Sequence, residues 1–560
     1  MDGLYKESHV RIDTSHGVSK RTNLIDCLQE YATTKPDTEA FVFASTTASR
    51  ESVTWLHLYQ RACATGRSLI QLGIKRNETI AINLRTCPEW LYAAFGAMIA
   101  GAVPVGISFT YKDGASDLIA TMEKLQNCSI LIMDPGLDNV NWNIIADHLD
   151  HYDKEGSVRS KKMPYLRYML GHAFANCQAS VKQFQDLFES ANPDIVVPKI
   201  DAEDAAMMLQ TPGSTGIPKF VVHTHKSLVA MGTSNSQYID NCYSLFNDRP
   251  FTWVGGFLLS VLTGQTRVTV SGFCASPKNV VSFMVDVIQN ERCSLVLALP
   301  PLMAELMKRQ NDLPADWPVE VIMSGGQPLT KSLVKCIGKV CKSFGSLYAG
   351  TEVLGLTQLL VRDPENFSEY GCGKALHMKG FEMKIVNEDG KTVPVNTRGE
   401  IFVKSPAMFK EYYNDSAKTR QAKSDDGWFK TDDIGRMTKN GEFFVESRKS
   451  NTIISGGMNL APEILEQVMK SFPGVDAVVY VPVPDEVLYQ AVCACVIKKP
   501  GCDITEEKLR SCCEEFHADK PGLFTVLPKY YIFLDRFPLL SSGKVNRVEL
   551  KRNANELLCL

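Results

Sequence analysis

Residues 208–225 read MLQTPGSTGIPKFVVHTH, and this stretch decides which class of fold the rest of the chain must fit. A short apolar strand over 205–209 leads into a loop in which Gly213 and Gly216 free the backbone to turn its N–H groups inward. Three side chains can add two hydroxyl donors and a positive charge to these N–H groups, namely Ser214, Thr215 and Lys219. A strand followed by such a loop is typical of a site that cradles phosphate groups.

The loop is not a Walker A loop, because its lysine comes three residues after the second glycine and is not followed by Ser or Thr. On its own, the same composition also fits a surface turn rich in Gly and Ser. Which interpretation holds therefore depends on the other motifs of the chain.

The first part of the chain, up to about residue 200, alternates between helical and strand patterns. Apolar residues recur at helical spacing over 56–72, and the pattern stops at Gly73. Short buried strands are expected over 79–84 and 129–133, with a helix over 88–100 between them. This alternation predicts parallel sheets with helices on their faces.

From residue 380 to residue 445 the pattern changes to paired strands, with hairpin signals at Asp389-Gly390 and Asn440-Gly441. The remainder of the chain returns to a mixture of helices and strands. We therefore predict a domain boundary near Ser447, which divides the chain into residues 1–446 and 447–560.

Composition places the chain among large globular proteins. With 560 residues it is too long for one hydrophobic core, so two or more domains are expected. Apolar residues at 44% and charged residues at 22% exclude a disordered or coiled-coil chain. The formal charge of −3 gives no general attraction to nucleic acid, and we expect no nucleic-acid partner.

The cysteines and the apolar runs bear on the cellular location. The 17 cysteines are scattered and form no Cys-x-x-Cys pair, which indicates reduced thiols rather than a zinc knuckle or a disulfide framework. The longest uncharged stretch, residues 90–111, is interrupted by glycines and a proline, and residues 1–10 lack the apolar run of a secretion signal. We expect a cytoplasmic protein without a transmembrane segment, and leave peroxisome, mitochondrion and oligomeric state open.

Five further motifs follow the loop: Ser324-Gly-Gly-Gln-Pro-Leu329, Tyr348-Ala-Gly-Thr-Glu352, Trp428-Phe-Lys-Thr-Asp-Asp433, Gly456-Gly-Met-Asn-Leu-Ala-Pro462 and Ser541-Ser-Gly-Lys544. In this order and at this spacing, the six motifs resemble those of the adenylate-forming superfamily. That superfamily includes acyl-CoA synthetases, coumarate-CoA ligases, beetle luciferases and non-ribosomal adenylation domains. Each motif is weak alone, but the ordered set is hard to obtain by chance, and the resemblance covers nearly the whole chain.

The resemblance implies a mixed α/β (α+β) fold. Its large N-terminal domain would consist of layered α/β subdomains with a β-barrel-like part. A small, mobile C-terminal α/β domain would follow.

The resemblance also implies a nucleotide site made of Thr211, Gly213, Ser214, Thr215, Gly216, Lys219, Gly325, Gly326, Gln327, Pro328, Tyr348, Gly350, Thr351, Asp433, Arg448 and Lys544. For the metal, it implies that Mg²⁺ is bound by Thr215, which is in that set, and by Glu352. Catalytic roles are implied for Lys544, Glu352, His225 and Arg448.

For the other substrates, the resemblance implies an acyl pocket that includes His223, Phe251, Trp253, Gly255 and Gly256. Contact with CoA is implied for Gly456, Gly457 and Met458. The i, i+2 spacing of His223 and His225 on a strand would place both on one face, but no third metal ligand is near them in sequence.

The reaction that the resemblance implies is the ATP-dependent activation of a fatty or aryl carboxylic acid to acyl-AMP, followed by transfer to CoA. ATP, CoA and Mg²⁺ are the expected cofactors. A luciferase-like oxygenase, an enzyme that loads a carrier protein and a nucleotide-binding relative without catalysis stay open as alternatives.

This chain departs from the family pattern at several positions, although none removes a group that contacts phosphate or metal there. Pro212 replaces Ser, Phe220 and Asp432 replace Gly, and Ala349 stands before Gly350. Near the hinge after Arg448, the unusual residues are Ser447 and Ser450. These departures make it unsafe to transfer a substrate from one relative to this chain.

Overall fold

The structure is a computed structural model that describes residues 5–13, 21–45, 50–107, 115–136, 140–172, 182–211, 219–232, 244–253, 255–271, 280–298, 300–326, 331–368, 370–451, 453–455, 458–460, 462–485, 489–518, 527–540 and 543–560. Contacts divide the chain into two compact units. The large unit comprises Val10–Met383 and Val403–Trp428, and the small unit comprises Met1–His9, Lys384–Phe402 and Phe429–Leu560. These units are defined by contacts and are not continuous along the chain, so they do not test the predicted domain boundary at residue 447, which stays a prediction.

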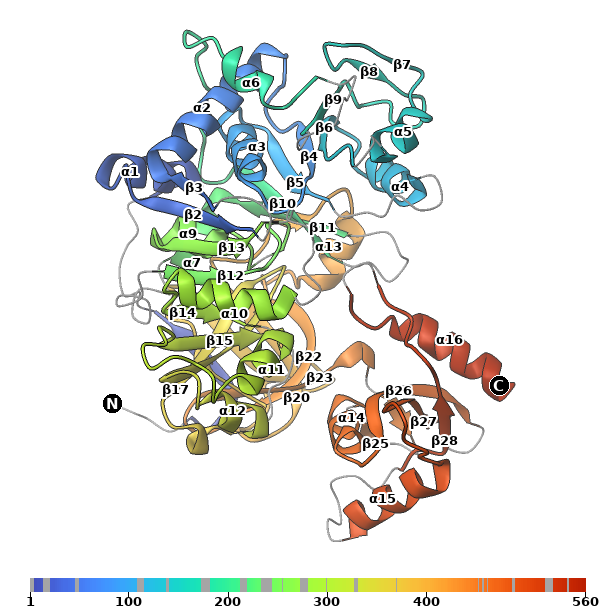
Figure 1. The fold of residues 1–560 in the computed structure, drawn as a ribbon. Coiled ribbons are helices and arrows are strands. Elements are labelled where there is room, and N and C mark those ends of the chain that lie inside the picture. Colours follow the sequence, from blue (N-terminus) through green and yellow to red (C-terminus); the bar gives the residue numbers. More distant parts are fainter. Residues whose placement is uncertain are drawn as a thin grey trace. The chain divides into compact units, whose positions relative to one another are not determined.

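The first sheet of the large unit contains β4 (Thr79–Asn83), β5 (Val103–Gly106), β6 (Cys128–Met133), β9 (Tyr168–Gly171), β10 (Ala205–Thr211), β11 (Lys219–Thr224) and β21 (Glu411–Tyr412). Their order is β21-β11-β10-β5-β4-β6-β9 (Figure 1). The strands from β10 to β9 run parallel, whereas β11 pairs antiparallel with β10 and β21. The parallel arrangement expected from the strand and helix patterns is confirmed.

The second sheet of the large unit contains β2 (Glu39–Ala44), β3 (Glu51–Thr54), β12 (Ser244–Asn247), β13 (Thr266–Val270), β14 (Leu295–Leu297), β15 (Val321–Gly325), β16 (Ser343–Gly350), β17 (Leu354–Val361) and β18 (Gly371–Ala375). Within the large unit they follow the order β18-β17-β16-β15-β14-β12-β13-β2-β3. The run from β16 to β2 is parallel, and antiparallel strands close both sides of it.

Helices cover these sheets and enclose apolar cores. The helices of the large unit include α1 (Leu24–Thr34), α2 (Trp55–Gln71), α3 (Pro88–Ile99), α4 (Ser116–Lys124), α5 (Val140–Ala146), α6 (Asp186–Glu189), α7 (His225–Gly232), α9 (Leu258–Thr263), α10 (Val280–Asn290), α11 (Pro300–Lys308), α12 (Lys331–Ile337) and α13 (Ser416–Ala422). Helix α3 is apolar on all sides, and Glu89 is its single residue that is not buried. A helix of this composition belongs in the interior.

In the small unit, residues that are far apart in the sequence form hydrogen bonds with each other. The Ser8 N–H donates to the carbonyl of Val393 at 2.8 Å, and the Ser8 hydroxyl donates to the carbonyl of Pro394 at 3.0 Å. Four further strands lie next to one another in the order β19 (Phe381–Val386), β20 (Gly399–Lys404), β22 (Phe429–Met437) and β23 (Glu442–Arg448). β22 and β23 belong to the small unit, whereas β19 and β20 each extend by a few residues into the large unit. The described sheets are open, so the expected barrel-like part consists of antiparallel strands that do not close into a barrel.

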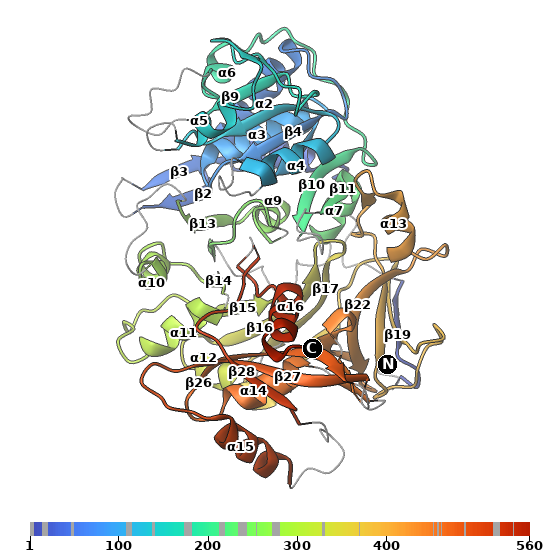
Figure 2. The same cartoon turned by 90° about the vertical axis from the view of Figure 1, so that its right-hand side faces the viewer.

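The C-terminal part of the small unit contains β24 (Ile453–Ser455), β25 (Met458–Leu460), β26 (Val475–Asp485), β27 (Tyr489–Lys498), β28 (Tyr530–Phe533), α14 (Pro462–Lys470), α15 (Glu506–Ala518) and α16 (Arg547–Leu558). Side chains alternate across the long hairpin of β26 and β27. Tyr480 and Val492 pack with α14 and α15 on one face, and Val481 and Cys493 pack with α16 on the other (Figure 2). This sheet therefore carries an apolar core on each face.

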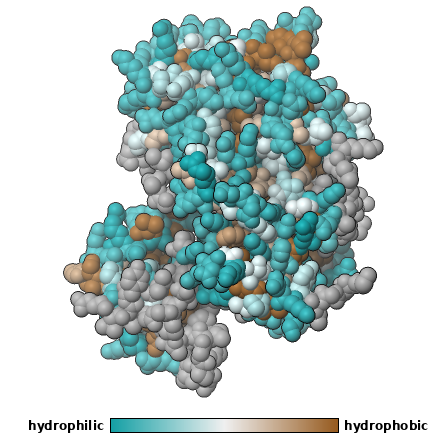
Figure 3. All heavy atoms as spheres, turned by 180° about the vertical axis from the view of Figure 1, so that it is seen from behind, coloured by the Kyte–Doolittle hydropathy of each residue, from teal (hydrophilic) through white to brown (hydrophobic). Residues whose placement is uncertain are grey.

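The described part of the chain contains no helix that is both long and apolar enough to span a membrane. The face shown in Figure 3 carries mostly hydrophilic side chains with scattered apolar ones, as expected when the large apolar residues lie inside.

The packing of α2 against α3 depends on Gly96. A Cβ atom at Gly96 would lie 2.5 Å from the Cβ of Thr65 on α2, closer than two carbon atoms that are not bonded to each other can approach. We expect Gly96→Ala to lower the free energy of unfolding of the large unit by about 1–3 kcal/mol, measured by urea denaturation.

Gly232→Ala, at the end of α7, is the matched control. Its nearest neighbour would be Leu262 Cβ at an ordinary 3.4 Å, so the change should be neutral or slightly stabilising. Equal effects of the two substitutions would show that helix propensity rather than close packing decides the result.

Candidate active site

The Tyr348–Glu352 motif lies where β16 ends and the chain turns back into β17. The two strands pair antiparallel, with an irregularity between Tyr348 and Ala349. At the end of the turn, Leu354 has a φ of +56°, a left-handed conformation that is rare for leucine. Because this conformation costs about 1–2 kcal/mol, contacts around the turn must hold it in place.

Three hydrogen bonds hold the turn. His223 Nε2 donates to the carbonyl of Thr351 at 2.7 Å, and the Phe409 N–H donates to the carbonyl of Glu352 at 2.7 Å. The Tyr412 hydroxyl donates to the Glu352 carboxylate at 2.8 Å. The backbone at position 352 is therefore oriented by Phe409, which precedes β21 (Glu411–Tyr412), and its carboxylate by Tyr412 of that strand.

Lys219 lies beside the same tyrosine. It is the first residue of β11 and pairs in register with Thr211, the last residue of β10, so the two flank the glycine loop. Its Nζ lies 5.3 Å from the centre of the Tyr412 ring. Tyr412 thus contacts two predicted site residues, Lys219 and Glu352, although no sequence motif singled it out.

The two histidines have different surroundings. Because the carbonyl of Thr351 can only accept, His223 carries its proton on Nε2, which leaves Nδ1 unprotonated, 3.2 Å from the Ser227 hydroxyl oxygen. His225 Nδ1 instead accepts from the Leu24 N–H at 3.3 Å. Burial lowers the pKa of each imidazole to about 4, so both are neutral at physiological pH.

The expectation that both histidines share one strand face is wrong, because β11 ends at Thr224 and His225 is the first residue of α7. His223 contacts the turn of the Tyr348–Glu352 motif, whereas His225 contacts the start of α1. A catalytic role of His225 stays a prediction.

Gly325 and Gly326 lie next to the same motif, at the end of β15. Gly325 is opposite Leu347 of β16, and a Cβ atom there would lie 2.5 Å from the Leu347 carbonyl oxygen. Gly326 has a φ of +81°. The chain therefore needs glycine at 325 for close strand approach and at 326 for a left-handed turn.

An apolar cavity of about 170 Å³ lies in the large unit beside the motif. Residues of the second sheet and of helices α7 and α9 line it. The apolar side chains among them include Met231, Leu245, Leu258, Leu259, Leu262, Leu295, Leu297, Val321, Met323, Leu347, Ala349, Leu354, Leu359, Leu360 and Leu376. Two lining side chains are polar, and one of them, Thr357, donates its hydroxyl hydrogen to the carbonyl of Cys372 at 2.6 Å.

Of the predicted acyl-pocket residues, Gly255 lines this cavity. Phe251 is 1% exposed and lies in an aromatic cluster with Trp90, 5.4 Å between ring centres. Trp253 is 37% exposed, with the guanidinium of Arg249 5.6 Å from its ring centre. Gly256 has no room for a side chain, since a Cβ atom would lie 2.7 Å from the Pro250 carbonyl oxygen.

Arg267 on β13 holds this loop together. Its fully buried guanidinium donates to the carbonyls of Asn247, Arg249 and Gly256, and it lies 4.6 Å from the centre of the Phe251 ring. The three carbonyls stand at both ends of residues 247–256, so one side chain fixes the whole loop. Sequence analysis missed Arg267 because it lies outside every motif.

In the small unit, Asp433 and Arg448 are directly opposite each other on β22 and β23. The Arg448 Nε donates to the Asp433 carboxylate at 3.0 Å. Asp432 has a φ of +59°, the conformation for which glycine is favoured and which aspartate tolerates better than most residues. Asp432 therefore adopts a conformation that glycine would adopt more easily.

The remaining predicted site residues are only partly described. Lys544 closes a turn in which its carbonyl accepts from the Leu540 N–H at 2.8 Å, and Met458 begins β25. Several predictions fall outside the described residues: Gly213, Ser214, Thr215, Gly216, Gln327, Pro328, Gly456 and Gly457. Within the large unit, the structure does bring together Thr211, Lys219, His223, Gly325, Tyr348, Thr351 and Glu352.

Comparison with known proteins agrees with this geometry. Residues 28–413 match the model of the AMP-binding enzyme family, and residues 465–544 match the model of the AMP-binding enzyme C-terminal domain. The first match spans more than half of the chain. The chain therefore belongs to the AMP-binding enzyme family.

Among curated relatives, 4-coumarate:CoA ligase 1 of Petunia hybrida is 28% identical over 521 residues, which cover 89% of this chain and 88% of the relative. Among solved structures, the ATP-bound MatB of Rhodopseudomonas palustris has a TM-score of 0.77 at 21% identity, covering 96% of this chain and 99% of that one. The o-succinylbenzoate CoA synthetase of Bacillus subtilis has a TM-score of 0.75 at 22% identity, covering 95% and 99%. These structures share the fold.

The three carbonyls bound by Arg267 provide a test of its role. We expect Arg267→Met to lower the free energy of unfolding by roughly 3 kcal/mol or more, since each buried carbonyl left without a donor costs about 1–3 kcal/mol. Urea denaturation measures the loss.

Arg11→Met is the control, because its exposed guanidinium pairs with Asp13 at the surface. It should cost about 1 kcal/mol or less. A loss from Arg267→Met as small as that from Arg11→Met would contradict the role of Arg267 in fixing the loop.

Proposed function

We propose that this chain is an AMP-forming acid–CoA ligase that acts on an apolar, aliphatic carboxylic acid. It joins the acid to AMP with release of pyrophosphate, and then transfers the acyl group to the thiol of CoA. The observation that carries the proposal is the apolar cavity that shares Leu347, Ala349 and Leu354 with the turn that holds Glu352. An acid in this cavity can direct its carboxylate toward the nucleotide motif.

The chemistry requires positive charge rather than a protein nucleophile. A free carboxylate is a poor acyl donor, and its attack on a phosphate brings two anions together, so the site must align the reactants and neutralise charge. Lys219 offers a cation at the edge of the glycine loop. We assign the same task to Arg448 and Lys544 of the small unit.

Glu352 fits a Mg²⁺ ligand. Its carboxylate is a hard oxygen donor of the kind that Mg²⁺ prefers, and Tyr412 holds one of its oxygens in place. Bound Mg²⁺ supplies charge neutralisation at the phosphates. Tyr412 keeps the carboxylate oriented, and His223 keeps the turn that carries it in position.

The cavity lining supports an aliphatic acid over a hydroxylated aromatic one. Its walls are almost entirely leucine, valine and methionine, and the Thr357 hydroxyl already donates to a backbone carbonyl. A phenolic hydroxyl buried there without a partner would cost about 1–3 kcal/mol, whereas each buried methylene group contributes about 0.8 kcal/mol. The 4-coumarate named for the relatives is therefore not the substrate that we propose here.

A reducing compartment such as the cytoplasm is the location that we propose. The described cysteines are free thiols, which supports this assignment.

A pyrophosphate-release assay with a panel of acids tests the function. We expect release with saturated fatty acids in the presence of CoA, and a kcat/KM for octanoate at least tenfold above that for 4-coumarate. Release that does not depend on CoA, with a carrier protein or oxygen as the second reactant, would instead favour the alternatives. No release with any acid would contradict the enzyme assignment.

The same panel with Leu297→Phe tests the cavity, since the larger side chain fills it from β14. The kcat/KM for a long acid should fall at least tenfold relative to that for a short acid, with the KM for ATP unchanged. Val296→Ile is the matched control, because the neighbouring side chain packs into the core on the opposite face of β14. Unchanged chain-length preference in Leu297→Phe would place the acid elsewhere.

Tyr412→Phe tests how Glu352 is held. Removing the hydroxyl frees the carboxylate, so the Mg²⁺ concentration for half-maximal pyrophosphate release should rise about tenfold, while high Mg²⁺ restores most of the rate. Tyr413→Phe removes a hydroxyl that donates to Asn127 at 2.7 Å and should leave the Mg²⁺ dependence unchanged. Identical Mg²⁺ titrations for Tyr412→Phe and wild type would remove Tyr412 from the metal site.

A further inference from the structure

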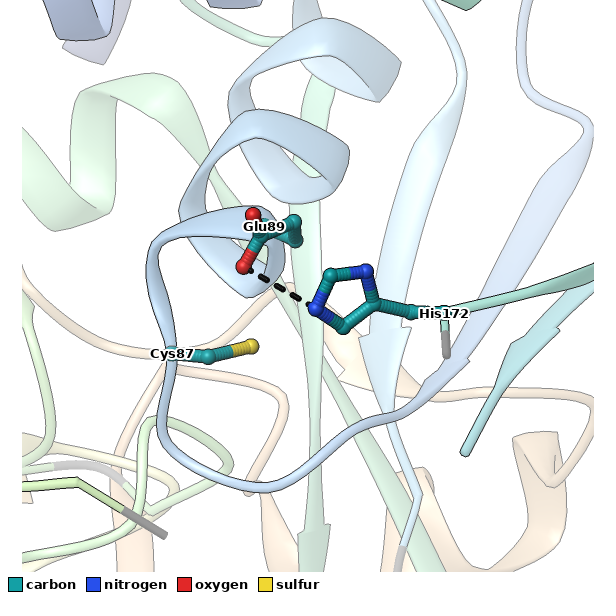
Figure 4. A group of neighbouring side chains, drawn as sticks. All are labelled: Cys87, Glu89 and His172. Atoms are coloured by element: carbon teal, nitrogen blue, oxygen red, sulfur yellow. Dashed lines mark ion pairs between the residues drawn. The ribbon is translucent and has the colours of Figure 1, made fainter. Parts of the chain in front are cut away.

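Three side chains with metal-binding chemistry meet in the large unit, outside the predicted nucleotide and acyl residues. Cys87 precedes the first residue of α3, Glu89 lies in its first turn, and His172 directly follows β9. One ligand atom from each, a sulfur, a carboxylate oxygen and an imidazole nitrogen, lies within 4.8 Å of the others. Figure 4 shows the sulfur and the carboxylate directed toward the imidazole ring.

The spacing within this cluster matches a shared ion. His172 Nε2 and the Glu89 carboxylate oxygen are 3.3 Å apart. A charge-assisted hydrogen bond would be about 2.7–2.9 Å long. Two ligands bound at about 2.0 Å to one tetrahedral zinc ion lie about 3.3 Å apart. The observed separation fits two ligands of one ion better than a short charge-assisted hydrogen bond.

Burial and charge also suit a divalent cation. Cys87 and His172 are each 2% exposed. When a metal binds, the cysteine becomes a thiolate, so the thiolate and the carboxylate together balance the two positive charges of the ion, and the imidazole stays neutral. A buried set of this kind is stable when its charges are compensated.

The backbone holds the ligands in place before any ion binds. Strands β4, β6 and β9 are parallel neighbours, so the segments after their carboxyl ends meet at one edge of the sheet. The His172 N–H donates to the carbonyl of Met133, the last residue of β6, at 2.9 Å. Ligands from two distant segments are thus fixed by the sheet itself.

We propose that Cys87, Glu89 and His172 bind one Zn²⁺ ion, with water as the fourth ligand, and that this ion links the start of α3 to the end of β9. A thiolate together with an imidazole selects zinc over Mg²⁺, which prefers oxygen ligands alone. The site is separate from the Mg²⁺ that accompanies ATP. It does not depend on the proposed reaction, so its test requires no turnover.

Metal content of the purified full chain tests the proposal. After incubation with excess zinc sulfate and desalting, elemental analysis should find about one zinc per wild-type chain. Cys87→Ser and His172→Asn should each retain at least tenfold less zinc. Controls are needed because the chain has many other cysteines and histidines. Cys63→Ser on α2 and His148→Asn after α5 are matched controls and should retain the zinc.

Cobalt identifies the ligands directly. Co²⁺ added to the zinc-free protein should give a thiolate-to-metal charge-transfer band in the near ultraviolet in wild type and Cys63→Ser, and no such band in Cys87→Ser. Glu89→Gln, which keeps the side-chain size, should bind Zn²⁺ at least tenfold more weakly in a competition titration. Wild-type protein without zinc above background, or Cys87→Ser with the full wild-type content, would overturn the proposal.

Discussion

The turn between β16 and β17 is the constraint on which the site depends. It places Leu354 in a conformation that leucine avoids, and hydrogen bonds from His223, Phe409 and Tyr412 hold it there. On one side of the turn stands the carboxylate of Glu352, and on the other the wall of the apolar cavity. The same short segment therefore joins the part of the site that handles charge to the part that takes an apolar chain. A change that relaxes the turn would disturb both.

Much of the fold could be predicted because it depends on local pattern. The strand expected over 79–84 is β4, the helix expected over 88–100 is α3, and the strand expected over 129–133 is β6, each within a residue at either end. These segments are mostly apolar, so burial and periodicity point to the same structure. The end of β11 was missed, although Thr224 is an N-cap residue that could have marked the start of α7, and its hydroxyl accepts from the Ser227 N–H at 3.1 Å.

The candidate site was predictable only where it consists of motifs. Lys219 and Glu352 stand in motifs, yet Tyr412, which contacts both, comes from a segment without any recognisable pattern. Arg267 was missed for a similar reason, since its partners are backbone carbonyls, which no sequence displays. Asp432 was noted as a departure, but only its φ of +59° explains why the family pattern has glycine there.

The hydrogen bonds of Ser8 have a consequence for how the chain is made. Ser8 donates to Val393 and Pro394, so these hydrogen bonds cannot form until a segment up to 386 residues later has been synthesised. At about 5–20 residues per second, that interval lasts roughly 20–80 s. Throughout it, Ser8 remains without these two hydrogen bonds, while the strands of the large unit can already form. Ser8 thus leaves the ribosome long before the partners that fix it.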